Sequence, residues 1–315
     1  MVRKKDLVLV TGGAGFIGSN IIDKLLEKDY KVRIIDNFCT GKIENIRHII
    51  NEVELIRGDI RNKNIVYKAM KGVDCVFHEA ALRSVPRSID DPVSTNDVNI
   101  NGTLNLLMAA KKSGVKRFIY ASSSSLYGDA KDLPKKESQR PQPVSPYAVS
   151  KLTGEYYCRV FSKSFGLETV SLRYFNVFGP RQDSESKYAV VVPKFINSGL
   201  KKEPFLIHGD GKQSRDFTYI DNVVSANILA MKAKDVSGMA FNIACHERYS
   251  VLDIAYTVSK ILKIKPKFIF EPRRAGDVMH TFADISLAKK YLKFKPLVLF
   301  KEGMSKTIEY FRYKE

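Results

Sequence analysis

The sequence predicts an α/β fold in which helices cover both faces of a parallel sheet, with a smaller α/β region toward the C-terminus. Two observations support this fold. Short apolar segments alternate with amphipathic ones over residues 1–175, and the first apolar segment leads directly into a glycine-rich turn. Beyond residue 175 the alternation weakens, so we expect a second region over residues 176–315, with some later segments returning to the first domain.

The elements are expected where apolar clusters lie between turn residues. The strands fall at residues 7–10, 31–35, 53–56, 73–78, 116–121 and 169–173, and the clearest helices at about 16–28, 92–113 and 147–165. We also expect Asp221 to cap a later helix. Ligands bind at the carboxyl ends of strands in a doubly wound sheet, and Asp59, Ala81 and Ser122 all follow strands at that edge.

The glycine-rich turn predicts a bound dinucleotide. Glycines at 12, 15 and 18 permit a tight turn, let backbone N–H groups approach a pyrophosphate, and allow the following helix to pack on the strand. Asp36 ends the second strand, where a carboxylate accepts hydrogen bonds from an adenosine ribose and repels a 2′-phosphate. The sequence therefore predicts a Rossmann-type domain that binds NAD rather than NADP, with residues 37–41 around the adenosine.

Tyr147 and Lys151 are four residues apart and share one face of a helix that begins near Pro146. An ammonium beside a phenol lowers its pKa from about 10 toward the range of a general base at neutral pH. Such pairs also occur by chance on helix surfaces. The run of serines at 122–125 strengthens the prediction, because Ser123 follows a strand and can share a proton with a substrate hydroxyl.

Composition narrows the class of protein. With 52 Lys and Arg against 34 Asp and Glu, the formal charge of +18 suits a polyanion partner or small phosphorylated ligands. The basic residues form scattered short pairs, so we expect no nucleic-acid partner. No apolar run reaches the roughly 18 residues of a membrane span, and the first is too short for a signal peptide, which predicts a cytoplasmic protein. Four widely spaced cysteines without CxxC predict reduced thiols and no metal site.

Six motifs together resemble the extended short-chain dehydrogenase/reductases: GGAGFIG, DN at 36–37, AA at 80–81, SSSSLYG, SPYAVSK and LRYFNVFGPRQ. Within them the chain resembles nucleotide-sugar 4-epimerases of the UDP-glucose and UDP-N-acetylglucosamine type, over about residues 7–310. The resemblance implies an NAD-dependent enzyme that acts on a UDP-sugar, with Ser123, Tyr147 and Lys151 as catalytic residues. It also implies a homodimer formed through helices 92–113 and 147–165 of each subunit.

The resemblance further assigns ligand contacts residue by residue. The NAD-binding residues would be Gly12, Gly15, Phe16, Ile17, Gly18, Asp36, Asn37, Phe38, Thr40, Gly41, Asp59, Ile60, Ala80, Ala81, Arg83, Asn99, Ser122, Tyr147, Lys151 and Tyr174. The substrate-binding residues would be Ser84, Ser123, Ser124, Tyr147, Asn176, Gln182, Ala189, Val190, Lys194, Ile207, His208, Arg215, Arg274, Asp277 and Thr281. Among these, the arginines suit bidentate contact with a diphosphate, and Asp277 suits the uridine ribose.

The reaction and the sugar can be narrowed further. Dehydratases and decarboxylases of this superfamily usually place an acidic residue just after the serine hydroxyl, where this chain has Ser124 and Ser125. Thr281 is small where a tyrosine would exclude an N-acetyl group, and Ser84, Ser124 and Gln182 can hydrogen-bond an acetamido group. We therefore expect interconversion of UDP-GlcNAc and UDP-GalNAc, with UDP-Glc and UDP-Gal as further substrates.

Several alternatives stay open. Arg83 stands where some N-acetyl-using members have glycine, and UDP-glucuronate 4-epimerases also carry a serine run before the YG pair, so a uronate substrate is one alternative. Another nucleotide-sugar enzyme of this fold, such as a dehydratase, is a second. A module that senses NAD or binds RNA is a third, although it would not need a complete Ser/Tyr/Lys set.

Overall fold

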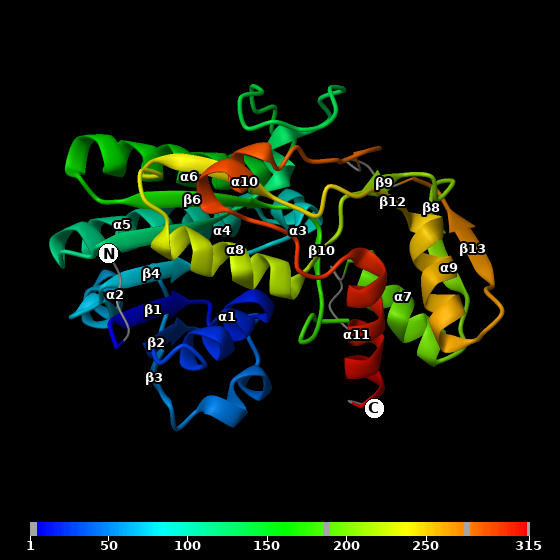
Figure 1. Ribbon diagram of the computed structural model, residues 1–315, viewed down its shortest axis with the longest axis horizontal. Helices are drawn as coiled ribbons and strands as arrows, with labels where there is room; N and C mark the ends of the chain where they lie inside the picture. Colours follow the sequence, from blue (N-terminus) through cyan, green and yellow to red (C-terminus); the bar gives the residue numbers. More distant parts are fainter. Residues whose placement is uncertain (1–4, 185–189, 274–277, 314–315) are drawn as a thin grey trace.

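The computed structural model describes residues 5–184, 190–273 and 278–313. At its centre lies a seven-stranded parallel sheet in the order β11-β6-β5-β4-β1-β2-β3 (Figure 1). The strand order reverses between β1 and β4, which is where doubly wound sheets bind their ligands. The strands are β1 (Leu7–Thr11), β2 (Lys31–Asp36), β3 (Val53–Arg57), β4 (Cys75–His78), β5 (Arg117–Ser123), β6 (Thr169–Tyr174) and β11 (Met239–Ile243). The predicted doubly wound parallel sheet is confirmed.

The sheet is buried on both faces, which explains the continuous apolar runs in its strands. Along β1, Val8 and Val10 pack into one core and Leu9 into the other, because successive side chains point to opposite faces. The Leu9 face is covered by α2 (Lys63–Met70), α5 (Gly102–Lys112) and α6 (Pro146–Phe165), and the opposite face by α1 (Phe16–Leu26) and α8 (Ile220–Lys232) (Figure 1).

The predicted helix 92–113 is interrupted. It consists of α4 (Pro92–Asn96), a π-helical segment (Asp97–Asn101) and α5. A π segment shifts the side chains that follow it, and such segments are frequent at functional sites. Here Asn99 lies within it, 1% exposed, and its side chain bonds to the backbone of Leu82 and to the Ser150 hydroxyl. The irregular turn therefore links this helix to α6 and to the loop after β4.

The prediction that Asp221 caps a helix is wrong. The N-cap residue of α8 is Tyr219, and no side chain of the described chain makes a cap hydrogen bond there. The neighbouring Asn222 has the structural role instead: its amide oxygen accepts from the backbone N–H groups of Leu297 and Val298, and its amide nitrogen donates to the Val298 carbonyl. Asn222 thereby ties α8 to the segment that precedes the last helix.

The chain beyond Tyr174 forms a smaller region of helices and short strand pairs, drawn in light green, orange and red in Figure 1. Its helices are α7 (Val191–Leu200), α9 (Val251–Leu262) and α11 (Phe300–Arg312), while α8 and β11 return to the large sheet and α10 (Ser286–Leu292) contacts β11. The pairs are β7 (Val177–Phe178) with β10 (Thr218–Tyr219), β8 (Phe205–His208) with β13 (Phe268–Glu271), and β9 (Ser214–Arg215) with β12 (Tyr249–Ser250). One hydrophobic core runs from the sheet into these helices, so the two regions pack as one body.

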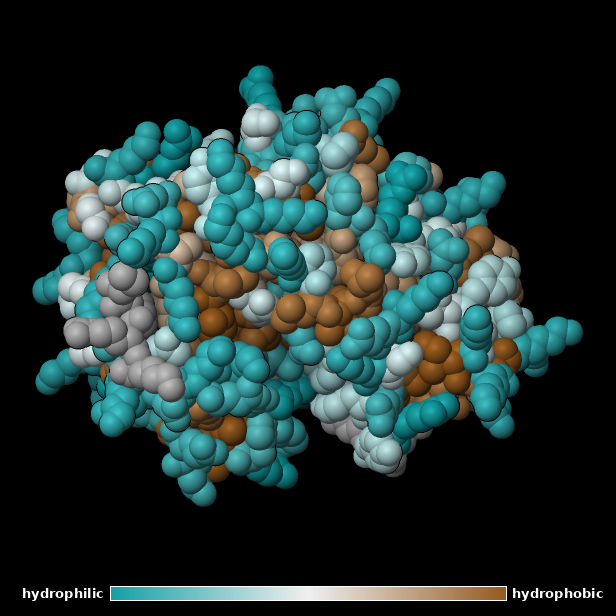
Figure 2. All heavy atoms as spheres, viewed as in Figure 1, coloured by the Kyte–Doolittle hydropathy of each residue, from teal (hydrophilic) through white to brown (hydrophobic). Residues whose placement is uncertain are grey.

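The surface fits the scattered charge pattern of the sequence. Figure 2 shows hydrophilic side chains spread over the face in view, with smaller apolar patches between them. Among the described residues, no helix combines the length and the apolar composition that crossing a bilayer requires.

The contact between α6 and β5 leads to a stability prediction. A Cβ at Gly154 would lie 2.2 Å from the hydroxyl oxygen of the buried Tyr120. For Gly154→Ala, we expect an overpacking cost of about 1–3 kcal/mol, which exceeds the roughly 1 kcal/mol that alanine gains over glycine in a helix. Urea unfolding should therefore show a net loss of stability. The control is Thr153→Ala on the same helix, where the removed hydroxyl donates to the Val149 carbonyl. If both variants unfolded alike, the tight α6–β5 contact would be refuted.

Candidate active site

The glycine turn opens the amino end of α1 to a ligand. Gly12 has φ +68°, and a Cβ there would lie 2.8 Å from Ala80 Cα, while a Cβ at Gly18 would lie 2.3 Å from the Gly12 carbonyl oxygen. Only glycine permits this close approach of strand, turn and helix. Gly15 is the N-cap of α1, and within the described chain no side chain bonds to the first N–H groups of that helix. Phe16 and Ile17 begin the helix, so these N–H groups suit a pyrophosphate.

Asp36 connects this turn to the loop after β2. Its Oδ2 accepts from Ala14 N at 2.9 Å and its Oδ1 from Phe38 N at 2.8 Å. Burial raises the pKa of Asp36, and the two backbone hydrogen bonds oppose that shift. A Cβ at Gly41 would lie 2.9 Å from Asp36 Oδ2, so the predicted loop of residues 37–41, including Thr40, closes tightly on the carboxylate.

The third strand supplies the next part of the same pocket wall. Asn37 donates from Nδ2 to Asp59 Oδ2 at 2.8 Å, and the hydrogen bonds of Arg61 lower the pKa of Asp59 to about 2. Ile60 is buried beside Gly102, where a Cβ would meet the Ile60 side chain. The structure thus gathers the residues predicted around the adenosine at the ends of β1, β2 and β3, in an arrangement that fits NAD.

The predicted catalytic residues come together at the ends of β5 and α6. Ser145 caps α6 by accepting from Ala148 N at 3.2 Å, and this orients the helix start that carries Tyr147. The Ser123 hydroxyl hydrogen-bonds to the Tyr147 phenol. Lys151 Nζ donates to the Ala121 carbonyl at 2.8 Å and lies 5.9 Å from the centroid of the Tyr147 ring. A serine, a phenol and a cation therefore converge at one edge of the sheet.

The electrostatics of this trio differ from the sequence-based expectation. Burial raises the pKa of Tyr147 above its usual value; the Ser123 hydrogen bond and the positive charge of Arg83 lower it, and Glu79 raises it. The prediction that Lys151 lowers this pKa stays a prediction: its ammonium donates to the Ala121 carbonyl and lies 5.9 Å from the centroid of the phenol ring. Burial lowers the pKa of Lys151 itself to about 8, against the opposing effect of Glu79.

Two residues that were predicted to contact NAD lie beneath the site. Ser122 donates from its hydroxyl to Glu155 Oε1 at 2.5 Å, and Glu155 forms a buried ion pair with Arg173 at 2.8 Å. Asn99 is equally occupied with protein partners. The Ser122 side chain therefore connects β5 to α6 and, through Glu155, to β6. The Asn99 side chain connects α6 to the loop after β4.

Three of the predicted substrate residues, Asn176, Arg215 and Thr281, lie on hydrogen-bonded segments that we call the substrate wall. Asn176 donates from Nδ2 to the Asp216 carbonyl at 3.1 Å and to Thr281 Oγ1 at 3.3 Å. Arg215 donates from NH1 to the carbonyls of Ser214 and Met279, both at 3.0 Å. These bonds bring three chain segments together: the one after β6, the β9–β10 region, and residues 278–284.

The other predicted substrate residues lie in several different elements and have different partners. Ser84 accepts from Arg87 N at 3.3 Å as the N-cap of α3 (Val85–Asp90), and Ser124 begins a 3₁₀ turn. Gln182 is buried and donates to the Val177 carbonyl, while Val190 is the N-cap of α7 and Lys194 lies within it. The side chain of Ile207 is completely buried in the core, and His208 pairs with Glu271. Ala189, Arg274 and Asp277 lie outside the described residues.

Sequence reasoning missed two carboxylates at the site. Asp216 is completely buried, and burial raises its pKa to about 7; it accepts from the backbone N–H groups of Cys245 at 3.0 Å and Ala283 at 3.3 Å. Asp216 thus anchors the substrate wall. The sequence signal that could have identified it is an acidic residue between Arg215 and a short apolar run. Glu79, between His78 and Ala80, accepts from the Tyr174 hydroxyl at 2.9 Å. Nothing in its local sequence indicated that contact, since Tyr174 is far away in the chain.

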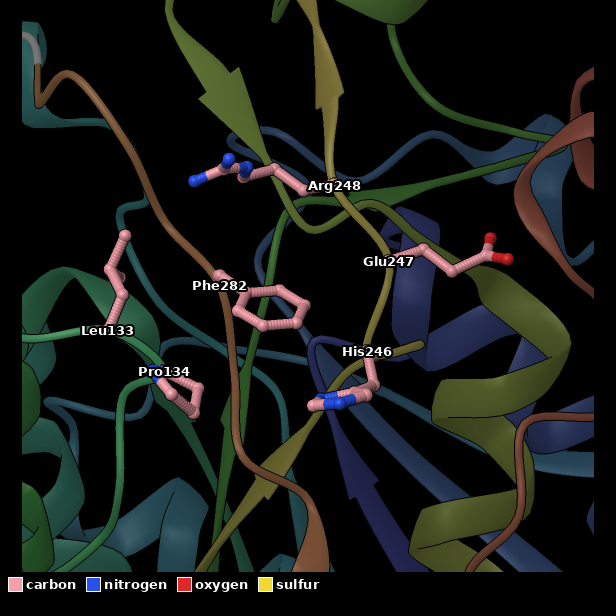
Figure 3. A pocket seen from close by; sticks show the side chains of 6 residues that line it. All are labelled: Leu133, Pro134, His246, Glu247, Arg248 and Phe282. Atoms are coloured by element: carbon pink, nitrogen blue, oxygen red, sulfur yellow. The ribbon is translucent and has the colours of Figure 1, made fainter.

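A separate hollow of about 480 Å³ lies outside the predicted site. Figure 3 shows the rings of His246 and Phe282 near its centre, with Glu247 and Arg248 extending outward in different directions. The two rings stack with centroids 4.6 Å apart, and Leu133 and Pro134 complete the lining. Of the predicted NAD- and substrate-binding residues that the structure describes, none lines this hollow, although Phe282 follows Thr281.

Comparisons with known proteins agree with the geometry. A model of the NAD dependent epimerase/dehydratase family matches residues 8–244. The chain is 41% identical to the UDP-N-acetylglucosamine 4-epimerase of Methanobrevibacter ruminantium M1, which was solved in complex with UDP-N-acetylmuramic acid. The TM-score is 0.95, and the match covers 99% of this chain and 100% of that one. It is 37% identical to the UDP-glucose 4-epimerase of Thermotoga maritima, solved with UDP-glucose, with a TM-score of 0.94 and coverage of 98% and 99%.

A third structure carries an acidic sugar. The UDP-glucuronic acid 4-epimerase of Bacillus cereus, solved in complex with UDP-glucuronic acid and NAD, is 36% identical, with a TM-score of 0.92 and coverage of 98% of this chain and 100% of that one. The three relatives are thus similar in fold and differ in the sugar that their names specify. The family prediction made from the motifs is confirmed: this chain belongs to the NAD-dependent epimerase/dehydratase family, and the three relatives compared above are UDP-sugar 4-epimerases.

Proposed function

We propose that this protein is an NAD-dependent 4-epimerase of UDP-hexoses that interconverts UDP-GlcNAc and UDP-GalNAc and also accepts UDP-Glc and UDP-Gal. The observation that carries the proposal is the Ser123–Tyr147 hydrogen bond beside the buried Lys151, at the same sheet edge as the glycine turn. A proton-transfer apparatus next to a dinucleotide cradle suits reversible oxidation of a hydroxyl.

In the proposed mechanism, Tyr147 as phenolate takes the proton from the sugar 4-hydroxyl, with Ser123 bridging the two oxygens. Bound NAD supplies reversible hydride exchange at C4. The resulting 4-keto sugar is planar at C4, so rotation of the sugar about its diphosphate presents the other face before Tyr147 returns the proton. Lys151 has three N–H donors and uses one on Ala121, which leaves others for a ribose hydroxyl of the cofactor.

Local chemistry favours epimerisation over elimination. Ser124 and Ser125 occupy the positions just after Ser123, where an eliminating enzyme would need a further acid. Thr281 is small and lies against Asn176 in the substrate wall, which supports an N-acetylated sugar. The UDP-N-acetylglucosamine 4-epimerase among the relatives is also the most identical of the three structures compared above.

One observation favours a second candidate, a UDP-glucuronate 4-epimerase. Arg83 is exposed in the loop after Ala81, and its charge acts on the Tyr147 phenol, so its guanidinium lies near the reacting end of the site. A carboxylate on the sugar would be a natural partner for an exposed guanidinium.

The homodimer is part of the proposal. A hollow of about 790 Å³ lies between α4 and the start of α6, lined in part by Val93, Ile100 and Val149. Val93 is 77% exposed, and farther along α6 Tyr156 is 54% exposed. Large apolar side chains on neighbouring helices indicate a protein–protein contact, and a second copy of these helices would cover them.

The first test removes the proposed base. Tyr147→Phe keeps the ring and loses the phenol oxygen, so we expect NAD content to stay unchanged and turnover of UDP-GlcNAc to fall by about 10²–10⁴, the usual contribution of general acid–base catalysis. Product analysis after incubation without added NAD measures this. Tyr156→Phe, an exposed tyrosine on the same helix, is the control and should match the wild type. Near-normal activity of Tyr147→Phe would show that another group is the base.

The second test separates the two sugar classes. Because Arg83 also acts on Tyr147, we expect Arg83→Ala to change kcat/KM for UDP-GlcNAc, UDP-Glc and UDP-glucuronate by a similar factor if the main proposal holds. If the enzyme is a glucuronate epimerase, kcat/KM for UDP-glucuronate should fall by about 10–100-fold, since a charge-assisted hydrogen bond contributes about 1.5–3 kcal/mol. The exposed Arg140→Ala is the control for a general loss of positive charge.

The third test concerns assembly. Val149 is 46% exposed on α6, and Val149→Asp would place a charge in the proposed contact. We expect light scattering after size exclusion to show a dimer for the wild type and a monomer for the variant, because an unpaired buried carboxylate is costly. Tyr313→Asp, 85% exposed at the other end of the chain, should remain dimeric. A wild-type monomer would refute this part of the proposal.

A further inference from the structure

A line of hydrogen bonds from distant parts of the chain ends at the carboxylate of Glu79. Glu79 follows β4 at the ligand-binding edge of the sheet, and its backbone N–H donates to the Thr11 carbonyl at 3.2 Å. The Tyr174 hydroxyl, at the end of β6, donates to Glu79 Oε1 at 2.9 Å. Asn227 on α8 donates in turn to the Tyr174 oxygen at 2.8 Å. Glu79 is therefore held in one orientation by the sheet and by a helix on its opposite face.

The charged and titratable groups around Glu79, Tyr147 and Lys151 come from four elements. Helix α6 contributes Lys151, Tyr147 and Cys158; β6 contributes Tyr174, the loop after Ala81 contributes Arg83, and β4 contributes His78. His78 is neutral, because burial lowers its pKa to about 3. The burial of the Cys158 thiol raises its pKa and keeps it uncharged. Glu79 is thus the anionic side chain that acts on both catalytic groups, Tyr147 and Lys151.

We propose that Glu79 is a positioning residue that balances the charge of Lys151 and holds Tyr174, and so sets the pH range in which Tyr147 and Lys151 work together. This inference rests on the epimerase function proposed above. A carboxylate in such a buried position costs free energy unless a cation and hydrogen-bond donors compensate it. Both are present, as the ammonium of Lys151 and the hydroxyl of Tyr174.

The direction of the effect follows from the charges. Burial raises the pKa of Glu79 to about 7, while Tyr174 and Lys151 lower it. When Glu79 is ionised, it favours the ammonium form of Lys151 and disfavours the phenolate form of Tyr147, so it raises the pKa of both groups. Below about pH 7 Glu79 becomes protonated and both effects weaken. Removal of its charge should therefore lower both pKa values together.

The test is Glu79→Gln, which keeps the size and an oxygen acceptor for Tyr174 while it removes the charge. The two limbs of the pH–rate profile report the titrations of Tyr147 and Lys151 as a coupled pair. We expect both limbs to move to lower pH by about half to one unit. The Lys151 ammonium loses a nearby opposite charge, and the Tyr147 phenolate loses a nearby like charge. A role in packing alone would lower the rate and leave both limbs in place.

A second readout does not depend on turnover. The chain contains 15 tyrosines and no tryptophan, so tyrosinate absorbance in the near ultraviolet is free of indole absorbance. Subtracting the titration of Tyr147→Phe from that of the wild type isolates Tyr147, and the same subtraction on the Glu79→Gln background gives its pKa without the carboxylate. We expect that pKa to be lower in the Glu79→Gln pair.

The matched control is Glu137→Gln. Glu137 is another partly buried carboxylate, it accepts from Asn242 N at 2.7 Å, and it does not act on Tyr147 or Lys151. This variant should leave both limbs and the phenol titration unchanged. Unmoved limbs and an unmoved phenol pKa in Glu79→Gln would overturn the inference. A shifted phenol pKa in a protein without epimerase activity would support the charge coupling and refute the proposed function, so the two failures are distinguishable.

Discussion

The packing of α6 against β5 is the contact on which the candidate active site depends. Four consecutive residues of β5 each have a partner on this helix. The Tyr120 ring lies against Gly154, the Ala121 carbonyl accepts from Lys151, Ser122 bonds to Glu155, and Ser123 bonds to Tyr147. The hydroxyl, the phenol and the ammonium are therefore positioned by the backbone geometry of one strand and one helix. Sites built on such regular elements are more rigid than sites built on loops.

Charge in this site is arranged so that each buried ion has a partner. The Arg173–Glu155 pair is only 6% exposed on each side, and hydrogen bonds from Ser122 and to Tyr127 surround it. A buried pair of this kind contributes little net stability, but removal of one partner is costly because the other is left uncompensated. The pair lies directly beneath Ser123 and Tyr174, so it restricts how far β5 and β6 can shift relative to α6. Glu79 and Lys151 also compensate each other, since the charge of Lys151 lowers the pKa of Glu79 and that of Glu79 raises the pKa of Lys151.

The substrate wall depends on one buried carboxylate, that of Asp216. Asp216 carries no substrate role in our proposal, yet its carboxylate gathers backbone N–H groups from the loop after β11 and from residues 278–284. Asn176 and Arg215 then reach across the same segments through carbonyl groups. Loops that would otherwise move independently are thereby joined around one buried acid, which explains how a region of short strands can present a defined surface to the sheet edge.

The sequence by itself determined the features that depend on local spacing. The glycine turn, the carboxylate after β2 and the four-residue spacing of Tyr147 and Lys151 are encoded within a few residues, because turn, strand and helix geometry repeat over short distances. Those features sufficed to predict the doubly wound sheet and the family. They also placed Ser123, Tyr147 and Lys151 at one sheet edge.

Only the tertiary structure decided how these groups are charged and what each side chain contacts. Lys151 bonds to the Ala121 carbonyl, and the pKa of Tyr147 is raised because burial outweighs the Ser123 hydrogen bond and the charge of Arg83. Glu79 meets Tyr174 from a strand 95 positions away in the chain. Protonation depends on desolvation and on charges brought together from distant segments, and neither quantity is present in a linear pattern of residues.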